Sequence, residues 1–236
     1  VLKLESAARS FVKDIEGSET LNLGINTRDE IEELSHSFET MSSEVKAYIS
    51  RLSKVTAEKE RIGAELNVAT KIQADMLPSI FPPFPERHEF DIYASMTPAK
   101  EVGGDFYDFF MIDQNHLALV MADVSGKGVP AALFMMIAKT LLKTQSQNGH
   151  SPSEVLQKVN NQLCENNPGE MFVSVWFGIY EISTGKLVAA NAGHEYPAVR
   201  KGDGNFELLK DRHGFVLAGM EGFGYKIQSI RLDPGD

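Results

Sequence analysis

The sequence predicts an α+β fold in which a long helical region is followed by a globular domain of mixed strands and helices. Residues 1–77 contain few aromatic residues, and their apolar residues follow helical spacing. Residues 90–236 hold short, alternating apolar runs together with most of the glycines and aromatic residues. The elements expected in this second part do not repeat a strand–helix–strand order, which argues against a parallel doubly wound sheet.

Composition limits the classes of partner. The chain has 236 residues and a net charge of -10, which argues against nucleic acid or an anionic lipid surface as its main partner. Its single cysteine, Cys164, allows no intrachain disulfide and is expected to be a small buried residue of a helix. No run of 18 apolar residues is present, so no segment of this sequence is expected to span a membrane.

The apolar residues of segment 31–76 recur at alternating steps of three and four, which is typical of a coiled coil. Lys59 and Gln73 occupy two positions of this seam and Gly63 adjoins it, so pairing is expected to be weaker there. A lone helix of this length would leave its apolar stripe uncovered, and we therefore expect a parallel homodimer. The alternative is two shorter helices that pack on the globular domain. The apolar seam positions are Ile31, Leu34, Phe38, Met41, Val45, Tyr48, Leu52, Val55, Ile62, Leu66, Ala69 and Met76.

The first 52 residues resemble a HAMP domain. Leu4–Ile15 has the spacing of its first helix, and residues 18–28 would form its extended connector. Asp29 and Glu30 suit the start of its second helix, because carboxylates there face the positive end of the helix dipole.

This resemblance implies a domain order. Residues 1–52 would be a dimeric HAMP relay, and residues 53–79 a regulatory linker helix. HAMP domains usually follow a transmembrane helix, so the resemblance also implies a spanning segment before Val1. The chain would then be the cytoplasmic part of a membrane protein.

Residues 80–89 contain Pro82, Pro83 and Pro85, which forbid a helix and predict a stiff linker. Residues 90–236 are expected to form one domain in which strands precede and follow a pair of helices. A turn at Gln114-Asn115 would join two strands into a hairpin. The expected strands are 90–98, 105–113, 116–122, 171–182, 186–191, 196–200, 206–210 and 225–232, and the expected helices are 130–147 and 152–167.

Three short motifs carry the chemistry: residues 101–108 (EVGGDFYD), 122–128 (ADVSGKG) and 190–194 (ANAGH). Asp105 follows two glycines, and Asp123 ends an apolar run and precedes a glycine-rich turn. A carboxylate held where the backbone can approach closely is suited to a hard divalent cation.

Together and in this order, the three motifs resemble the bacterial phosphatases of the SpoIIE and RsbU type, in the metal-dependent PPM (PP2C-like) superfamily. The resemblance implies a PP2C-like β-sandwich flanked by helices. It also implies that Asp123 bridges two Mn²⁺ or Mg²⁺ ions, that the backbone carbonyl of Val124 is a further ligand, and that Asp105 binds one ion. No side chain is needed as nucleophile, because water activated by the ions attacks phosphorus.

Each site residue also has a structural interpretation. Asp123 could be a helix N-cap and Asp105 a turn residue, but the surrounding motifs favour metal ligands. His194 and Lys127 are candidate auxiliary residues: His194 is either a general acid or a loop histidine, and Lys127 either contacts phosphate or is solvated. For Asp108 we expect a surface position or a supporting role behind the ligands.

The family's later metal-binding aspartates would come after Asp236. We therefore expect the phosphatase domain to be incomplete at its C-terminus, with weak metal affinity and little activity. The resemblance predicts a protein serine/threonine phosphatase under HAMP control, whose substrate is a phosphorylated STAS (anti-anti-sigma-like) protein. The alternative is a non-enzymatic, dimeric pseudophosphatase scaffold.

Overall fold

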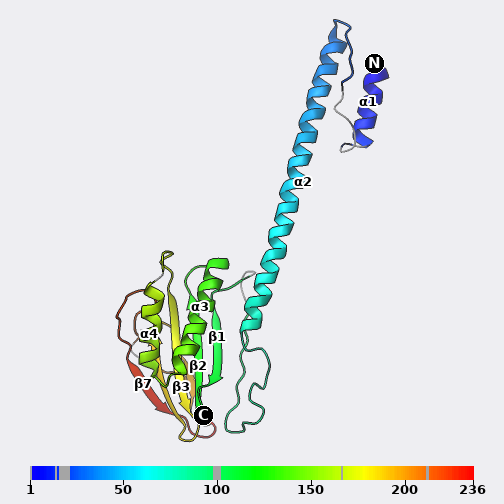
Figure 1. Ribbon diagram of the computed structural model, residues 1–236. Coiled ribbons are helices and arrows are strands. Elements are labelled where there is room, and N and C mark those ends of the chain that lie inside the picture. The colour runs from blue at the N-terminus through cyan, green and yellow to red at the C-terminus, as the bar shows by residue number, and fades with distance from the viewer. Residues whose placement is uncertain (1, 14, 16–21, 98–101, 166, 211–212) are drawn as a thin grey trace. The chain divides into compact units, whose positions relative to one another are not determined.

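A computed structural model describes the chain except residues 1, 14, 16–21, 98–101, 166 and 211–212 (Figure 1). The described residues form two compact units, Val1–Glu65 and Leu66–Asp236. None of the helices in this described part is both long and apolar enough to cross a membrane.

The first unit contains helix α1 (Leu2–Lys13) and most of helix α2 (Glu30–Met76). Asp29 caps α2, because its side chain accepts a hydrogen bond from the backbone N–H of Ile31 at 3.1 Å. The rings of Phe11 and Phe38 pack edge to face with centroids 6.2 Å apart. Helix α2 is continuous, so the prediction of one long helix is confirmed. Of the expected connector 18–28, residues 18–21 lie outside the described part of the chain.

The apolar seam positions of α2 within this unit are largely uncovered in the single chain. Among them, Leu34, Met41, Tyr48, Val55 and Ile62 are each between 46% and 64% exposed, and they recur at intervals of seven residues. The seven-residue interval places these side chains along one face of the helix.

The second unit contains a five-stranded antiparallel sheet with the order β1-β2-β3-β4-β7. The expected hairpin is confirmed: β1 and β2 pair from Phe106 opposite Ala122 to Met111 opposite Leu117. Two short strands, β5 and β6, form a separate pair. The strands are β1 (Phe106–Met111), β2 (His116–Val124), β3 (Val173–Glu181), β4 (Lys186–Ala192), β5 (Ala198–Arg200), β6 (Phe206–Leu208) and β7 (Ile227–Arg231).

Helices α3 (Val129–Ser146) and α4 (Pro152–Glu165) lie side by side over one face of this sheet (Figure 1). Alternate residues of β2 face them, so Val120 and Val124 are buried in the main core with Met135 and Leu156. Gly128 precedes α3 with φ of +78°, a backbone conformation that favours glycine and allows the sharp change from strand to helix.

The opposite face of the sheet is covered differently from the prediction. The proline-containing segment packs on it, with Phe81 and Phe84 in ring contact with Phe109 of β1. Residues 91–97 form no strand, so the expectation of a strand at 90–98 is wrong for this described stretch, and Pro98 lies outside it. Within the described residues, the second layer is therefore this irregular segment together with β5 and β6, and a full second sheet of the expected sandwich is not formed.

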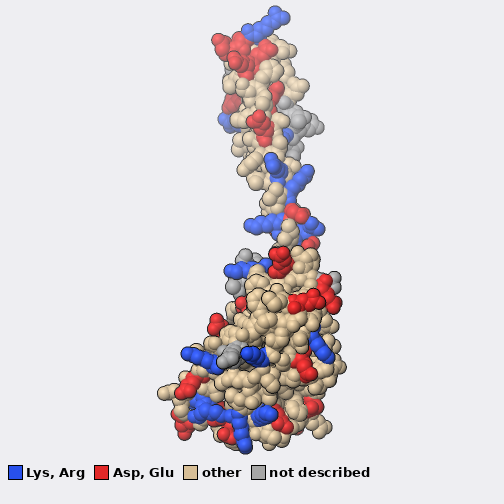
Figure 2. All heavy atoms as spheres, turned by 90° about the vertical axis from the view of Figure 1, so that its left-hand side faces the viewer, with Lys and Arg blue, Asp and Glu red and all other residues tan. Residues whose placement is uncertain are grey.

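Charged side chains of both signs are mixed on one face of the second unit. On the face that Figure 2 shows, acidic and basic residues are interspersed. This face therefore lacks the continuous basic surface that nucleic-acid-binding proteins present.

Candidate metal centre

Asp105 and Asp123 are brought together by the register of the β1–β2 hairpin. Phe106 pairs with Ala122 in antiparallel register, so the residue before β1 lies across from the residue after Ala122. Those two residues are Asp105 and Asp123. The hairpin therefore places two carboxylates at the same end of the sheet.

These two carboxylates line one cavity of about 440 Å³, together with Val124 and Lys127. Burial raises the pKa of Asp123 from 3.8 to about 6, helped by a hydrogen bond that protonated Asp123 donates to Asp105 and by the negative charge of Asp105. The hairpin register and the shared cavity place the two carboxylates where they can bind one cation together.

The donors of this cavity fit a hard divalent ion. Carboxylate and backbone carbonyl oxygens are the ligands that Mg²⁺ and Mn²⁺ prefer in proteins. Within the described part of the chain, no cluster of three or more His, Cys, Asp or Glu side chains forms a metal site, so the cavity supplies two carboxylates and backbone oxygens.

Gly104 allows the Asp105 loop to approach the end of β2. A Cβ atom at this position would lie 2.8 Å from the carbonyl oxygen of Val124 and 3.1 Å from its Cβ. Only glycine can occupy this position without displacing the loop. The close approach places the Val124 carbonyl beside the residue that precedes Asp105.

The turn after Asp123 is fixed by Ser125. Its backbone N–H donates to the carbonyl of Phe172 at 2.8 Å, and its hydroxyl oxygen accepts from the N–H of Phe172 at 2.9 Å. Ser125 is therefore a turn residue in the structure, as its place in the glycine-rich motif indicates.

His194 lies close to this cavity through Ser174 of β3, whose register partner is Asp123. The Ser174 hydroxyl is 2.8 Å from Nδ1 of His194, and it donates to the backbone carbonyl of Asp123 at 3.5 Å. Asn191 holds the backbone of His194 at two points, with N–H to Oδ1 at 2.8 Å and Nδ2 to the carbonyl at 3.0 Å. Burial lowers the pKa of His194 below 6.5, so its imidazole is neutral at neutral pH.

Two groups near the site were not predicted as partners. Asp108 is buried and forms an ion pair with Lys139 at 2.6 Å, so of the two expected positions the surface one is wrong, and the supporting role behind the ligands stays a prediction. Gln73, expected to be a seam residue, is 4% exposed and its side-chain amide binds the backbone of Gly103. A polar residue at an apolar heptad position was the only sequence signal for Gln73.

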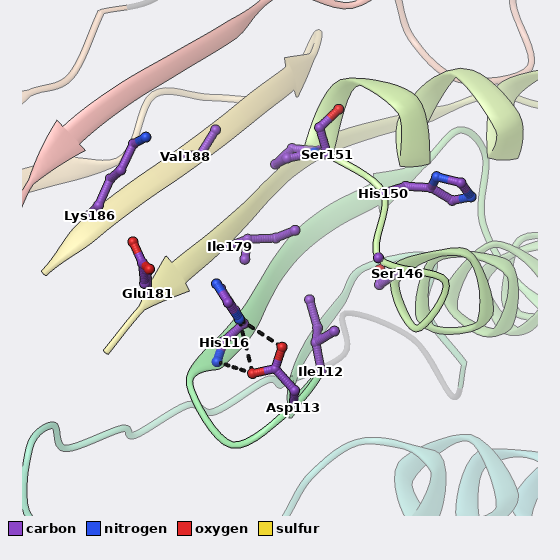
Figure 3. A pocket seen from close by; sticks show the side chains of 12 residues that line it. Ile112, Asp113, His116, Ser146, His150, Ser151, Ile179, Glu181, Lys186 and Val188 are labelled. Atoms are coloured by element: carbon purple, nitrogen blue, oxygen red, sulfur yellow. Dashed lines mark hydrogen bonds and ion pairs between the residues drawn. The ribbon is translucent and has the colours of Figure 1, made fainter. Parts of the chain in front are cut away.

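A second cavity of about 490 Å³ lies at the other end of the sheet (Figure 3). There, His116 Nδ1 is 2.8 Å from Oδ2 of Asp113, while Glu181 and Lys186 project from β3 and β4. β2 runs from His116 to Val124, so the strand separates this mixed-charge cavity from the aspartate pair.

Comparisons with known proteins agree with the architecture. The chain is 29% identical to Protein IcfG of Synechocystis over its whole length, and 30% identical over 75% of its length to Phosphoserine phosphatase RsbU of Bacillus subtilis. It spans 40% and 52% of the lengths of these two relatives.

A solved structure shares the fold. The SiaA-PP2C domain of Pseudomonas aeruginosa matches 76% of this chain and 70% of its own with a TM-score of 0.61, at 21% identity. The α+β fold with an antiparallel sheet and helices is thus that of PP2C-type domains. The family described as Stage II sporulation protein E (SpoIIE) matches residues 113–236, slightly more than half of the sequence. The chain belongs to the SpoIIE family of PP2C-like phosphatase domains.

Proposed function

We propose that this protein is a metal-dependent protein serine/threonine phosphatase. The observation that carries the proposal is the shared cavity of Asp105 and Asp123, in which burial and mutual proximity raise the pKa of Asp123 to about 6. A site that holds two carboxylates against their own repulsion is suited to a divalent cation. The name of the relative RsbU, a phosphoserine phosphatase, supports the same reaction class.

In this proposal Asp105, Asp123 and the carbonyl of Val124 hold Mn²⁺ or Mg²⁺. The ions, when bound, would lower the pKa of water and neutralise charge on the phosphate. Lys127 lines the same cavity and can attract the phosphate dianion. A neutral His194 can donate or accept one hydrogen bond at the leaving group, according to its tautomer.

We further propose that the helical region controls this site. Residues 1–52 would act as a HAMP relay and residues 53–79 as the linker helix of a homodimer. The exposed seven-residue repeat of α2 supports pairing with a second copy, because a second helix would cover it. The substrate would be a phosphorylated, STAS-like protein, as in the family that the motifs resemble.

The alternative is a non-enzymatic, dimeric pseudophosphatase scaffold. Among the described residues two carboxylates line the cavity, and both functions are compatible with this number, because the further aspartates of the family are expected after Asp236. A scaffold would bind phosphoprotein without turnover.

Mn²⁺ binding and phosphate release separate these functions. Calorimetry and hydrolysis of a phosphoserine peptide would be measured for the wild type, Asp123→Asn and the control Asp203→Asn, whose carboxylate is exposed in the β5–β6 turn. The phosphatase proposal expects weak but measurable Mn²⁺-dependent hydrolysis that only Asp123→Asn abolishes, with the fold retained. Mn²⁺ binding without any turnover would favour the scaffold, and unaltered activity in Asp123→Asn would exclude the proposed site.

A further inference from the structure

We propose that Gln73, on helix α2, is the residue that positions Asp105 for metal binding. This inference rests on the proposed function, because it assumes that Asp105 is a ligand. It adds a residue outside the three motifs and assigns a function to the last turn of α2.

The contact is made at two points. The side-chain Nε2 of Gln73 donates to the backbone carbonyl of Gly103 at 2.5 Å, and the N–H of Gly103 donates to Oε1 of Gln73 at 3.1 Å. One side-chain amide thereby satisfies both polar groups of one backbone residue. Two bonds to the same residue restrict rotation as well as position.

Gly103 lies two residues before Asp105, and the residue between them, Gly104, has no room for a side chain. Gly104 packs against the carbonyl of Val124 so closely that a Cβ would clash. The loop is therefore held between Gln73 on one side and the end of β2 on the other. Loss of the Gln73 contact would release the first of these two supports.

The last turn of α2 is itself anchored to the globular unit, so Gln73 has a rigid base. Leu77, directly after the helix, is buried in the main core. The hydroxyl of Tyr107, in β1, donates to the backbone carbonyl of Pro78 at 2.7 Å. Gln73, Leu77 and Pro78 thus connect the helix end to the same hairpin that carries Asp105.

The heptad pattern gives a second, independent argument. Gln73 continues the seam of Leu66 and Ala69, yet its side chain is buried against its own globular unit. Val68 and Ile72 are 61% and 53% exposed on the same part of the helix. A polar amide at this position is explained by the backbone groups of Gly103, which would cost free energy if left buried and unpaired.

The experiment compares Gln73→Met with the control Lys71→Met, which changes an exposed side chain in the same turn. Hydrogen–deuterium exchange of the metal-free protein and Mn²⁺ calorimetry are measured for each. Gln73→Met is expected to speed exchange of the backbone amides at 102–105 at least tenfold, while β2 and β3 keep their protection. Its Mn²⁺ affinity is expected to fall about tenfold, since two hydrogen bonds that order a ligand loop are lost. Lys71→Met is expected to match the wild type in both measurements.

A second variant keeps the test decisive if Gln73→Met also loosens the strands. Gln73→Asn keeps an uncharged amide but is one methylene shorter, so it can make at most one of the two hydrogen bonds to Gly103, and both effects are expected to lie between those of the wild type and Gln73→Met. With p-nitrophenyl phosphate as probe, both variants should require more Mn²⁺ for half-maximal activity and keep the rate at saturating Mn²⁺ within about twofold. A purely structural role would lower that saturating rate and leave the Mn²⁺ requirement unchanged.

The outcomes separate this inference from the proposed function. If Asp123→Asn abolishes Mn²⁺ binding while Gln73→Met leaves exchange and affinity unchanged, the positioning role of Gln73 is wrong and the metal site stands. If Asp123→Asn binds Mn²⁺ as the wild type does, the proposed metal site is wrong, and the positioning role that depends on it is overturned as well.

Discussion

Lys139 Nζ lies 2.6 Å from Oδ2 of Asp108, and both side chains are buried between helix α3 and strand β1. The other carboxylate oxygen of Asp108 accepts a hydrogen bond from the N–H of Phe109 at 3.0 Å. The ion pair connects α3, which begins just after the Asp123 turn, to the strand that begins just after Asp105. It therefore ties together the two segments from which the candidate metal ligands emerge.

Breaking this ion pair from one side is expected to destabilise the protein strongly. Lys139→Met leaves the Asp108 carboxylate buried without its partner, which costs about 3–5 kcal/mol in the free energy of unfolding. The control Lys143→Met, an exposed side chain one turn further along the same side of α3, removes only a cation–π contact to Phe110 and should cost less than about 1 kcal/mol. Urea denaturation would measure both. The double variant Lys139→Met/Asp108→Leu should recover much of the loss, and equal instability of Lys139→Met and Lys143→Met would contradict the prediction.

The raised pKa of Asp123 predicts a pH dependence of the metal-free protein. Its pKa is about 6 in the folded state against an ordinary 3.8, so the unfolded state loses this proton first as the pH rises. The free energy of unfolding should therefore fall from about pH 4 to about pH 6 and stay lower above that. The side chain is only partly buried, so solvent screens part of the interaction, and we expect the free energy of unfolding to fall by about 1 kcal/mol over this range.

Asp123→Asn isolates this effect in thermal unfolding without metal. The variant should be more stable than the wild type at pH 7.5 and equally stable below pH 4. Mn²⁺ competes with the same proton, so the Mn²⁺ affinity of the wild type should also fall below about pH 6. If Asp123→Asn is no more stable than the wild type at pH 7.5, repulsion between the Asp105 and Asp123 carboxylates does not lower the free energy of unfolding, and the prediction is wrong.

The close approach of Gly104 to Val124 predicts a defect in metal binding without unfolding. Gly104→Ala places a methyl group 2.8 Å from the Val124 carbonyl, and such overpacking costs about 1–3 kcal/mol unless the loop moves. Movement of the loop displaces Asp105, so we expect Mn²⁺ affinity to fall about tenfold in calorimetry. Gly63→Ala is the control, because nothing lies within 4 Å of the added carbon. It should stabilise helix α2 by about 1 kcal/mol and leave Mn²⁺ affinity unchanged.

Local patterns were enough to predict most of the elements. Both helices of the globular unit begin beside a proline and end within two residues of the expected positions, since Pro130 and Pro152 mark helix starts in sequence. The convergence of Asp105 and Asp123 was also predicted, from the motifs and the family that they resemble. The physical reason for this convergence is the register of the β1–β2 hairpin. The short turn between the two strands fixes which residues lie opposite each other, and Asp105 thereby lies across from Asp123.

Apolar and polar residues alternate along 90–97, and this pattern predicted a strand that the structure does not contain. Alternate side chains can be buried without the backbone pairing with another strand. Ile92, Ala94 and Met96 are partly buried against the core, while the residues between them are exposed. The segment is extended and packs by its side chains, with no ladder partner among the described residues. The Asp108–Lys139 pair spans 31 residues of sequence, and no local pattern could have indicated it.

The seven-residue repeat of α2 predicts a dimer that depends on its exposed seam. Val55 is 60% exposed in the single chain, and a second helix packed on this face would bury both copies. Val55→Lys replaces an apolar side chain at each copy, which costs about 1.5–3 kcal/mol per side chain, so the dimer dissociation constant should rise by a factor of 100 or more. Sedimentation equilibrium would measure this dissociation constant against that of Thr56→Lys, an exposed position beside the seam that should leave the constant within about threefold.

Lys59→Leu should act in the opposite direction and tighten the dimer, because it fills the one charged position of the seam with an apolar side chain. If the wild type sediments as a monomer at high micromolar concentration, or if Val55→Lys and Thr56→Lys behave alike, α2 does not pair through this face, and signals from the first unit must reach Gln73 along a single helix.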